Sequence, residues 1–506
     1  MGPDRSALLI SLNTASATAL AVGLPFAAFE RLVLFHFYLQ GGFVLDSGLL
    51  GSLLWHSDVA LTQPLSMGGG SYFATHVSPL FWLASAVSRL LSLTMPQFFE
   101  AFVGFSHGLL ALTIFWLLVE GFGLKRGAAP WLAAFAAVGF AFSALAIAIA
   151  LYPHFETLIA AFFLMFAVAQ YLGHARLACG FFLLGLATRE DAGLHYFAVL
   201  SLVVAVGLAR RVPLRQQRAE LIYLTAALIY VLVVMTAQRL VFPGASAFVR
   251  IYVGNPPFAA LGASVLWNRL LFFVVERPYV VWPALGAVFW ALWSRNPYLL
   301  LGYAASVPWV VLNLLAEGPL AAALIGYYAF PLLIGMAWPL LAVYRWRNRR
   351  GLEWRRPIAG FAALIALSFV PSGPPYNPGR LSLPRAFLDS PSRAWQAATD
   401  HGIAMLSRAR PLLGRLLVDN SVAALAPNGF TSAELPDLGG GGTMVPPELP
   451  DTVAYFTTGF DAARLRATAA AAGLANRYHV PGTPLHLAAR RRLDLLPPFE
   501  GLLVAE

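Results

Sequence analysis

Long uninterrupted apolar segments recur along most of this chain, and they limit its fold more than any other feature. Residues 128–151 and 321–344 are two of them. The hydrocarbon core of a bilayer offers no partner for backbone polar groups, so segments of this length cross it as α-helices, whose hydrogen bonds are internal. A transmembrane barrel would instead show short segments of alternating hydropathy. The sequence therefore predicts an all-α polytopic membrane protein.

The composition and the charge agree with this fold class. Hydrophobic residues make up 59% of the chain and charged residues only 11%, far from the balance of a soluble domain. The net charge of +10 would suit a nucleic-acid partner, but much of it lies in short loops between apolar segments, as in the cytoplasmic loops of membrane proteins. No nucleic acid is expected as a partner. The single cysteine, Cys179, excludes an internal disulfide and a cysteine-rich metal site.

The positions of the basic loops determine the expected number of crossings. About twelve apolar segments can be counted by length and hydropathy. If all of them crossed from a cytoplasmic N-terminus, the arginine-rich loop 210–218 would lie outside, against the positive-inside rule. The short segment 77–93, which contains Arg89 and is followed by Pro96, is the weakest candidate for a crossing. With that segment at the membrane surface, we expect about eleven transmembrane helices and basic cytoplasmic loops.

The same topology assigns an outer face. It receives a loop of residues 36–96 with juxtamembrane helices, a second long loop of residues 241–278, and the C-terminal tail. The proline-rich stretch 371–375 ends the membrane region because proline cannot continue a helix. Short strand-like segments and a capped helix follow it. We therefore expect a transmembrane domain of residues 1–371 and a small extracytoplasmic α/β domain of residues 372–506.

Ionisable residues on this outer face are the candidates for chemistry, because charge at membrane depth is costly. Asp46 follows the first crossing and suits a general base or a metal ligand, although it also suits a helix cap. His154 and Glu156 are two residues apart in a turn, where they suit a metal or proton site or an ordinary solvated turn.

Three further candidates lie on the same face. The turn Arg189-Glu190-Asp191 separates two apolar segments, and reads either as a functional acid cluster or as a local ion pair with helix caps. His76 lies in the same outer loop as Asp46, where a lone histidine is more often structural. Arg250 and Arg269 in the later outer loop suit bidentate phosphate binding or contact with lipid headgroups.

These motifs together resemble a known family. They read Phe43-Val44-Leu45-Asp46-Ser47-Gly48, His76-Val77-Ser78-Pro79-Leu80, Tyr152-Pro153-His154-Phe155-Glu156 and Arg189-Glu190-Asp191-Ala192-Gly193-Leu194. The combination resembles a family of uncharacterised bacterial membrane proteins that is related to the C-superfamily of glycosyltransferases (GT-C). The likeness covers residues 30–370. It departs from the family pattern in the order of the second motif and in having Arg189 where a lysine is usual.

The resemblance implies an inverting glycosyltransferase with a GT-C-like fold in the bacterial inner membrane. Such an enzyme moves a sugar from a polyprenyl-phosphate donor to an extracytoplasmic glycan, lipid or protein. In the superfamily an acid of the first outer loop deprotonates the acceptor, and Asp46 occupies that position. Glu156 and Glu190 would complete the catalytic group.

Binding roles are implied for the other candidates. Substrate and lipid phosphate would be bound by His76, His154, Arg189, Asp191, Arg250 and Arg269. No cofactor is certain; Mg²⁺ or Mn²⁺ held by Asp46, Glu156 and His154 fits the chemistry but is not required, because a neutralised phosphate is already a good leaving group.

Two other functions stay open. A transporter or flippase of lipid-linked sugars would need a polar path through the bundle, and the sequence shows few charges within the segments and no inverted pair of broken helices. A non-catalytic scaffold would present the C-terminal domain to partners in the cell envelope. The sequence leaves the sugar, the acceptor and the length of the lipid undefined.

Overall fold

The computed structural model describes most of the chain. The described residues are 5–40, 47–56, 58–62, 70–151, 154–243, 252–254, 256–259, 261–317, 322, 324, 326–346, 354–370, 387–425, 449–458 and 462–506. The chain forms two compact units. One unit comprises Met1–Ala28, Thr75–Leu80 and Val103–Leu381, and the other comprises Phe29–Ala74, Phe81–Phe102 and Ser382–Glu506.

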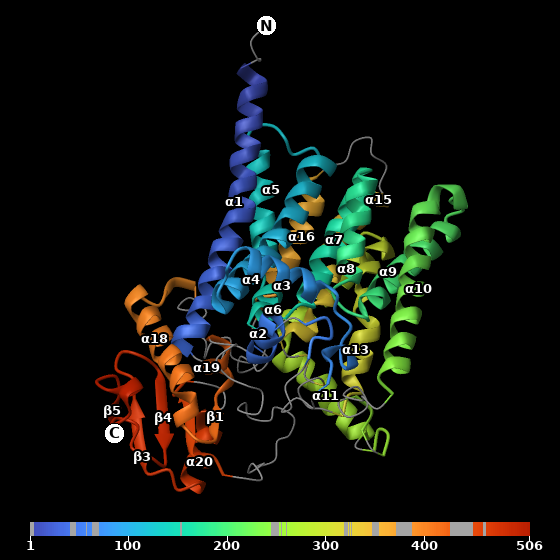
Figure 1. Ribbon diagram of the computed structural model, residues 1–506. Coiled ribbons are helices and arrows are strands. Elements are labelled where there is room, and N and C mark those ends of the chain that lie inside the picture. The colour runs from blue at the N-terminus through green and yellow to red at the C-terminus, as the bar shows by residue number, and fades with distance from the viewer. Residues whose placement is uncertain are drawn as a thin grey trace. The chain divides into compact units, whose positions relative to one another are not determined.

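The first unit is helical (Figure 1). Two of its helices, α1 (Arg5–Phe35) and α4 (Met95–Trp116), also contribute residues to the second unit. The other elements are η4 (Leu117–Gly121), α5 (Ala129–Ala141), α6 (Ala144–Ala150), α7 (Thr157–Leu172), α8 (Ala175–Leu186), α9 (Ala192–Ala209), η5 (Leu214–Gln217), α10 (Arg218–Val241), α11 (Ala263–Glu276), α12 (Pro278–Trp293), η7 (Pro297–Ala305), α13 (Val307–Leu314), η8 (Gly326–Ala329), α15 (Pro331–Trp346) and α16 (Arg355–Leu367).

Several of these helices are long and apolar enough to cross a membrane. Within the described residues, the continuous ones are Leu12–Leu39, Met95–Gly121, Ala192–Ala209, Leu214–Val241 and Gly326–Trp346. The helix pairs α5–α6, α11–α12 and α13 with η7 meet the same test jointly but bend by 51°, 88° and 55° at their breaks, which gives up to 8 spans. The mainly helical, membrane-type architecture agrees with the prediction from sequence, and the count of about eleven crossings stays a prediction.

Helix α7 forms the core of the first unit. Every residue from Thr157 to Ala169 is buried, and the helix packs against α8 and α15. A helix that is apolar on all sides belongs in the interior of a bundle. It ends at Gly173, whose φ of 90° lets the chain turn back into α8. The position of α7 therefore fixes Glu156, the residue that precedes its first turn.

Helix α9 approaches α10 closely at Gly193. A Cβ atom at this position would lie 2.5 Å from Cγ2 of Val231 and 2.7 Å from the carbonyl oxygen of Ala227. Small residues permit such close approach between membrane helices. Nearby, Tyr230 of α10 donates a hydrogen bond of 2.6 Å from its hydroxyl to the carbonyl oxygen of Leu186. These contacts hold the turn between α8 and α9 in place.

The acidic turns and the basic loops lie at opposite ends of the same helices. Helices α7, α8 and α9 are joined by short turns and alternate in direction, so α7 and α9 run the same way. Glu156 and Asp191 precede these two helices, whereas His174 and Arg210 follow them. The 18 residues of α9 alone span about 27 Å at 1.5 Å per residue, close to the thickness of a bilayer core.

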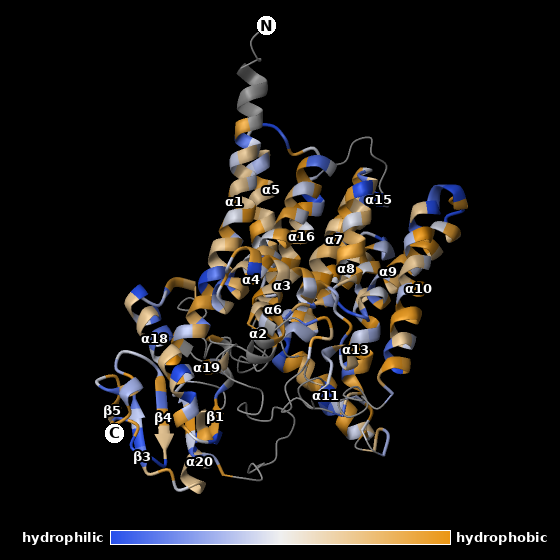
Figure 2. Ribbon diagram, viewed as in Figure 1, coloured by the Kyte–Doolittle hydropathy of each residue, from blue (hydrophilic) through white to orange (hydrophobic). Residues whose placement is uncertain are grey.

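Polar contacts join the basic loops to one another at their end of the unit. Arg210 donates a hydrogen bond of 2.7 Å from Nε to the hydroxyl of Tyr298, and Nη2 of Arg345 lies 3.0 Å from Oε1 of Glu220. In Figure 2 the ends of α10 and α15 that carry these residues are hydrophilic, and the bodies of the two helices are mostly hydrophobic. The described residues Arg210, Glu220 and Arg345, from or next to loops expected to be cytoplasmic, thus lie at one end of the helical unit.

The second unit combines short helices with a sheet. Its helical elements are η1 (His36–Gln40), α2 (Ser47–His56), η3 (Tyr72–Ala74), α3 (Leu80–Leu90), α18 (Arg393–Ala409), η9 (Arg410–Leu412), α19 (Asn420–Leu425), α20 (Ala462–Ala471) and η11 (Pro497–Phe499). Helices α2 and α3 contain 10 and 11 residues, or about 15 Å each, too short to cross a bilayer core of roughly 30 Å. They fit the expected juxtamembrane helices, and α2 packs against α19.

The sheet has five strands in the order β1-β2-β4-β3-β5. The strands are β1 (Leu416–Val418), β2 (Thr452–Phe456), β3 (Asn476–His479), β4 (Leu485–Ala489) and β5 (Val504–Ala505). Strand β1 pairs parallel to β2, and the other pairs are antiparallel. Residues of α18 and residues of α20 belong to two separate hydrophobic clusters, and strand β2 contributes residues to both. Strand β2 is therefore buried along its whole length. The small C-terminal α/β sheet predicted from the sequence is confirmed.

The distribution of charge predicts which way the protein faces. In a Cys179→Ser background, which removes the exposed native thiol, a cysteine replacing exposed Lys125 should react with a membrane-impermeant maleimide only after permeabilisation. A cysteine replacing Leu495, which is 68% exposed in the second unit, should react in intact cells. Labelling of Lys125→Cys from outside, with Leu495→Cys protected, would contradict the predicted orientation.

Candidate functional site

The candidate site is built on the first turns of α7 and α9. Glu156 is the N-cap residue of α7 and Asp191 that of α9. Neither side chain accepts a capping hydrogen bond from its own helix. Helix capping is therefore not what the Asp191 carboxylate does, whereas the local ion pair that was the other part of the same interpretation is present between Arg189 and Asp191. Both carboxylates are turned toward a third residue, Arg189.

The guanidinium of Arg189 joins the two turns. Its Nε donates a hydrogen bond of 2.7 Å to Oδ1 of Asp191, its Nη2 donates to Oδ2 of the same carboxylate, and its Nη1 donates to Oε1 of Glu156, 33 positions away in the chain. The pairing with Asp191 is bidentate, which fixes both distance and orientation. Arg189 is only 4% exposed. Three of its five N–H donors are thus used by carboxylates inside the protein.

Burial and pairing act in opposite directions on the pKa values of this pair. Burial by itself would raise the pKa of Asp191, but the adjacent charge and hydrogen bonds of Arg189 outweigh it and hold the pKa well below its usual range. Burial would likewise lower the pKa of Arg189, and the carboxylate of Asp191 more than offsets this effect, so that the pKa is raised. Both groups are therefore charged at neutral pH.

His154 is held against Glu156 and an aromatic ring. Its Nδ1 contacts Oε2 of Glu156, and its ring stacks on Tyr327 with centroids 4.0 Å apart. Burial lowers the pKa of His154 well below the ordinary value, and electrostatic interactions with His76 and Arg189 act in the same direction. The imidazole is therefore neutral at pH 7.

Glu190 and His76 form the more open side of the cluster. Oε1 of Glu190 lies 2.9 Å from Nδ1 of His76, and Oε2 accepts a hydrogen bond of 2.8 Å from the backbone N–H of Val77. The hydroxyl of Ser78 donates to the carbonyl oxygen of Thr188 at 2.6 Å, which docks the same segment onto the turn before α9. The His76 side chain is 30% exposed, against 5% for Arg189. The His76–Glu190 pair is therefore more exposed than the Arg189 guanidinium.

Aromatic side chains that no sequence motif indicated line the cluster. Cζ of Arg189 lies 4.8 Å from the ring centroid of Trp309, and the Trp309 ring stacks on Tyr328 at 6.0 Å. Tyr328 in turn stacks on Tyr327 at 4.4 Å, which completes a row of rings that ends at His154. These residues come from α13 and η8, more than a hundred positions from Arg189. Only the fold brings them to the site.

His195 is a second addition, and here a sequence signal existed. It lies four residues after Asp191 on the same face of α9, and its Nε2 is 3.9 Å from Oδ2 of that carboxylate. Its Nδ1 lies 2.6 Å from the carbonyl oxygen of Ala305, which fixes the ring. The spacing Asp-x-x-x-His in the first turn of a predicted helix would have indicated this contact.

The structure thus brings together most of the expected site residues. The residues that meet are His76, His154, Glu156, Arg189, Glu190 and Asp191. Arg269 lies on α11 and donates a hydrogen bond of 2.6 Å from Nη1 to the carbonyl oxygen of Leu314, a contact that ties α11 to α13. Asp46 and Arg250 lie outside the described residues, so their relation to the cluster stays a prediction.

A divalent cation would need Asp46, Glu156 and His154 as its expected ligands. Glu156 and His154 contact each other as expected, but the third expected ligand is Asp46. In the parts of the chain that the structure describes, no group of three or more His, Cys, Asp or Glu side chains is arranged to hold a metal ion. The described residues supply two of the expected ligands.

The cluster formally holds three carboxylates, from Glu156, Glu190 and Asp191, against one guanidinium. Carboxylates fixed in this way accept hydrogen bonds from hydroxyl groups, and an arginine beside them can exchange a carboxylate for a phosphate, which it binds with the same bidentate geometry.

No protein-family model matches the chain, and no curated protein matches it either.

Loss of the Arg189 charge should destabilise the helical unit. Arg189→Met would leave the Glu156 and Asp191 carboxylates buried without a partner, which costs about 3–5 kcal/mol. The expected result is a clear drop in the thermal unfolding temperature of the purified protein in detergent. Arg176→Met is the control, because Arg176 is exposed at the start of α8. The triple variant Arg189→Met/Glu156→Gln/Asp191→Asn should recover part of the loss; an unchanged unfolding temperature for Arg189→Met alone would contradict the ion-pair network.

Proposed function

We propose that the protein is a membrane-bound glycosyltransferase that moves a sugar from a polyprenyl-phosphate donor to an acceptor at the outer face of the bacterial inner membrane. The single observation that carries the proposal is the buried cluster of Arg189 with Glu156 and Asp191 at the ends of apolar helices. Ionisable groups at this depth are costly and are kept mainly where they act on a substrate or an ion. The motifs that supply the cluster are also those that carry the resemblance to GT-C enzymes.

The proposal includes an orientation. The end with the basic loops faces the cytoplasm together with the N-terminus, and the end with the Arg189 cluster faces outward, as does the C-terminal α/β domain. This is supported by the separation of the two ends along α7 and α9. With about eleven crossings and α3 at the membrane surface, α10 is the seventh crossing and residues 241–278 follow it as the long outer loop.

The proposed reaction is a single inverting displacement. Asp46 takes the proton from an acceptor hydroxyl as that oxygen attacks the anomeric carbon, and the bond from this carbon to the phosphate oxygen breaks. The electron pair leaves with the polyprenyl phosphate. Positive groups stabilise the charge that develops on the phosphate, the role proposed for Arg189 with Arg250 or Arg269. Three donors of Arg189 already bind carboxylates, so phosphate would bind the two remaining N–H groups or replace one of these carboxylates.

Glu156 and Glu190 position the acceptor through hydrogen bonds to its hydroxyl groups in this proposal. His76 and its partner Glu190 lie where the cluster is most open, so they meet the substrate first. The rings of Trp309 and Tyr327 keep water from the charged groups, which strengthens electrostatic interactions there. Mg²⁺ or Mn²⁺, if bound by Asp46, Glu156 and His154, would neutralise phosphate charge.

A flippase of lipid-linked sugars is the second candidate, because one observation favours it. Transporters often contain discontinuous helices whose broken ends bind substrate. Three helix pairs here are bent by more than 40° at a short break, and one of them, η7 with α13, supplies Trp309 to the cluster. A flippase would move the lipid-linked sugar without release of polyprenyl phosphate. The scaffold alternative has no comparable support.

The test of the enzyme is release of polyprenyl phosphate. Purified protein supplied with polyprenyl-phosphate sugars and a mixed pool of envelope acceptors should release it, and Asp46→Asn should slow release by about 10²–10⁴-fold, the usual contribution of a general base. The matched control is Asp58→Asn, an exposed carboxylate of the same loop that bonds to Thr62.

Two outcomes would contradict the proposal. Normal turnover by folded Asp46→Asn protein would show that Asp46 is not the base. Movement of the labelled lipid across proteoliposome membranes, without any release of polyprenyl phosphate by the wild-type protein, would instead support the flippase.

A further inference from the structure

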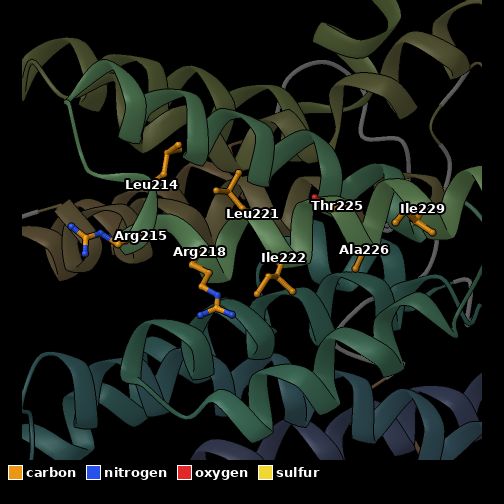
Figure 3. Close-up of a pocket in the computed structure, with 8 residues that line it drawn as sticks. All are labelled: Leu214, Arg215, Arg218, Leu221, Ile222, Thr225, Ala226 and Ile229. Carbon is orange, nitrogen blue, oxygen red and sulfur yellow. The ribbon is translucent and has the colours of Figure 1, made fainter.

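A shallow hollow runs along one face of η5 and α10. Figure 3 shows its lining side chains, with two arginines at one end and apolar or small residues along the rest. Arg215 and Arg218 form the charged end, and Leu221, Ile222 and Ile229 continue the row. Their spacing of three and four residues places them on one face of the helix. The small residues Thr225 and Ala226 also line the hollow.

The described part of the chain leaves this face of α10 uncovered. Among the five continuous spans, α10 has the smallest buried share. The side chains of Ile222 and Ile229 are 55% and 54% exposed, and farther along the helix Leu232 is 58% exposed. Apolar side chains exposed in this way over the length of a membrane-crossing helix need a nonpolar neighbour, and for a span that neighbour is lipid or another helix.

The charged end is available to an anion. Arg215 and Arg218 are both exposed, and neither has a carboxylate within 4 Å among the described residues. The nearest acid in the chain, Glu220, is buried and turned to Arg345, so that it does not compete for these guanidinium groups. Arginine binds phosphate oxygens through paired N–H donors.

The length of the hollow matches one leaflet of a bilayer. Arg218 and Ile229 are 11 positions apart, a rise of about 16 Å at 1.5 Å per residue, and half of a hydrocarbon core of roughly 30 Å is about 15 Å. The charge lies at the end of the span, where a headgroup lies, and the apolar row extends toward the middle, where acyl chains lie. A free phosphate ion would contact only the two arginines and not the apolar row.

We propose that this face of α10 is a binding site for an anionic glycerophospholipid. The phosphodiester lies on Arg215 and Arg218, and an acyl chain lies in the hollow over Ala226 between Ile222 and Ile229. The site is at the basic end of the unit, opposite the Arg189 cluster, so it is distinct from the site proposed for the sugar donor. It does not depend on the proposed enzymatic function.

Native mass spectrometry of the full-length protein in neutral detergent tests this site. With dioleoyl-phosphatidylglycerol added, the wild-type protein should retain one lipid in preference to dioleoyl-phosphatidylcholine. Arg215→Gln/Arg218→Gln should weaken retention by about thirtyfold, the combined effect expected of two basic residues at an anionic membrane surface. Arg126→Gln/Arg176→Gln, which removes the same charge from exposed positions at the same end, should bind as the wild type does.

A second variant tests the acyl chain separately. Ala226→Trp fills the hollow and leaves both arginines in place, so it should also reduce lipid retention. If the double arginine variant does not fold, this variant alone tests the proposed lipid site. Equal retention of the two lipids by the wild type would overturn the proposal, as would full competition by inorganic phosphate. Self-association of the protein that Ala226→Trp abolishes would show that a second copy, not a lipid, covers this face.

Discussion

The buried guanidinium of Arg189 is the interaction on which the helical unit depends. It binds carboxylates from the turns before α7 and α9 and so fixes the position of α9 relative to the fully buried helix α7. A buried ion pair is weak evidence for a stabilising role, because well-packed apolar residues can often replace one without loss. Removal of one partner is costly, however, so the charges must be kept together or lost together. The proposed function would account for their presence, because apolar residues could not bind a charged or polyhydroxylated substrate in this way.

Helix dipoles support the same arrangement. Glu156 and Asp191 lie at the N-terminal ends of α7 and α9, where the partial positive charge of a helix favours an anion. His174 and Arg210 lie beyond the C-terminal ends of these helices, where a cation is favoured. Because α7 and α9 run in the same direction, the acidic groups lie at one end of both helices and the basic groups at the other. The two ends are about the thickness of a bilayer core apart. The proposed orientation and the proposed site both follow from this polarity.

The two proposed ligands belong to different ends and have different requirements. The sugar donor would meet a buried, preorganised cluster whose members are held by one another and by aromatic rings around Trp309. The phospholipid would meet an open face of α10, where two flexible arginines and a row of apolar side chains suffice. Chemistry needs fixed charges shielded from water, whereas lipid binding at a membrane surface needs only charge and matching length. The close contact at Gly193 joins α9, which follows the Arg189 cluster, to α10, which carries the proposed lipid site.

The sequence by itself determined the helical, membrane-type architecture, the small C-terminal sheet and the turns that carry charge, because apolar length and local charge are properties of short segments. It indicated Glu156 and Arg189 separately, but not that they bind each other across 33 positions, and it left capping open as the role of Asp191. Trp309 and Tyr327 had no signal at all in a chain with 13 tryptophans and 17 tyrosines. Only the tertiary structure decided these contacts, because they depend on how α7, α9 and α13 pack, and packing between distant segments is not encoded in any local pattern.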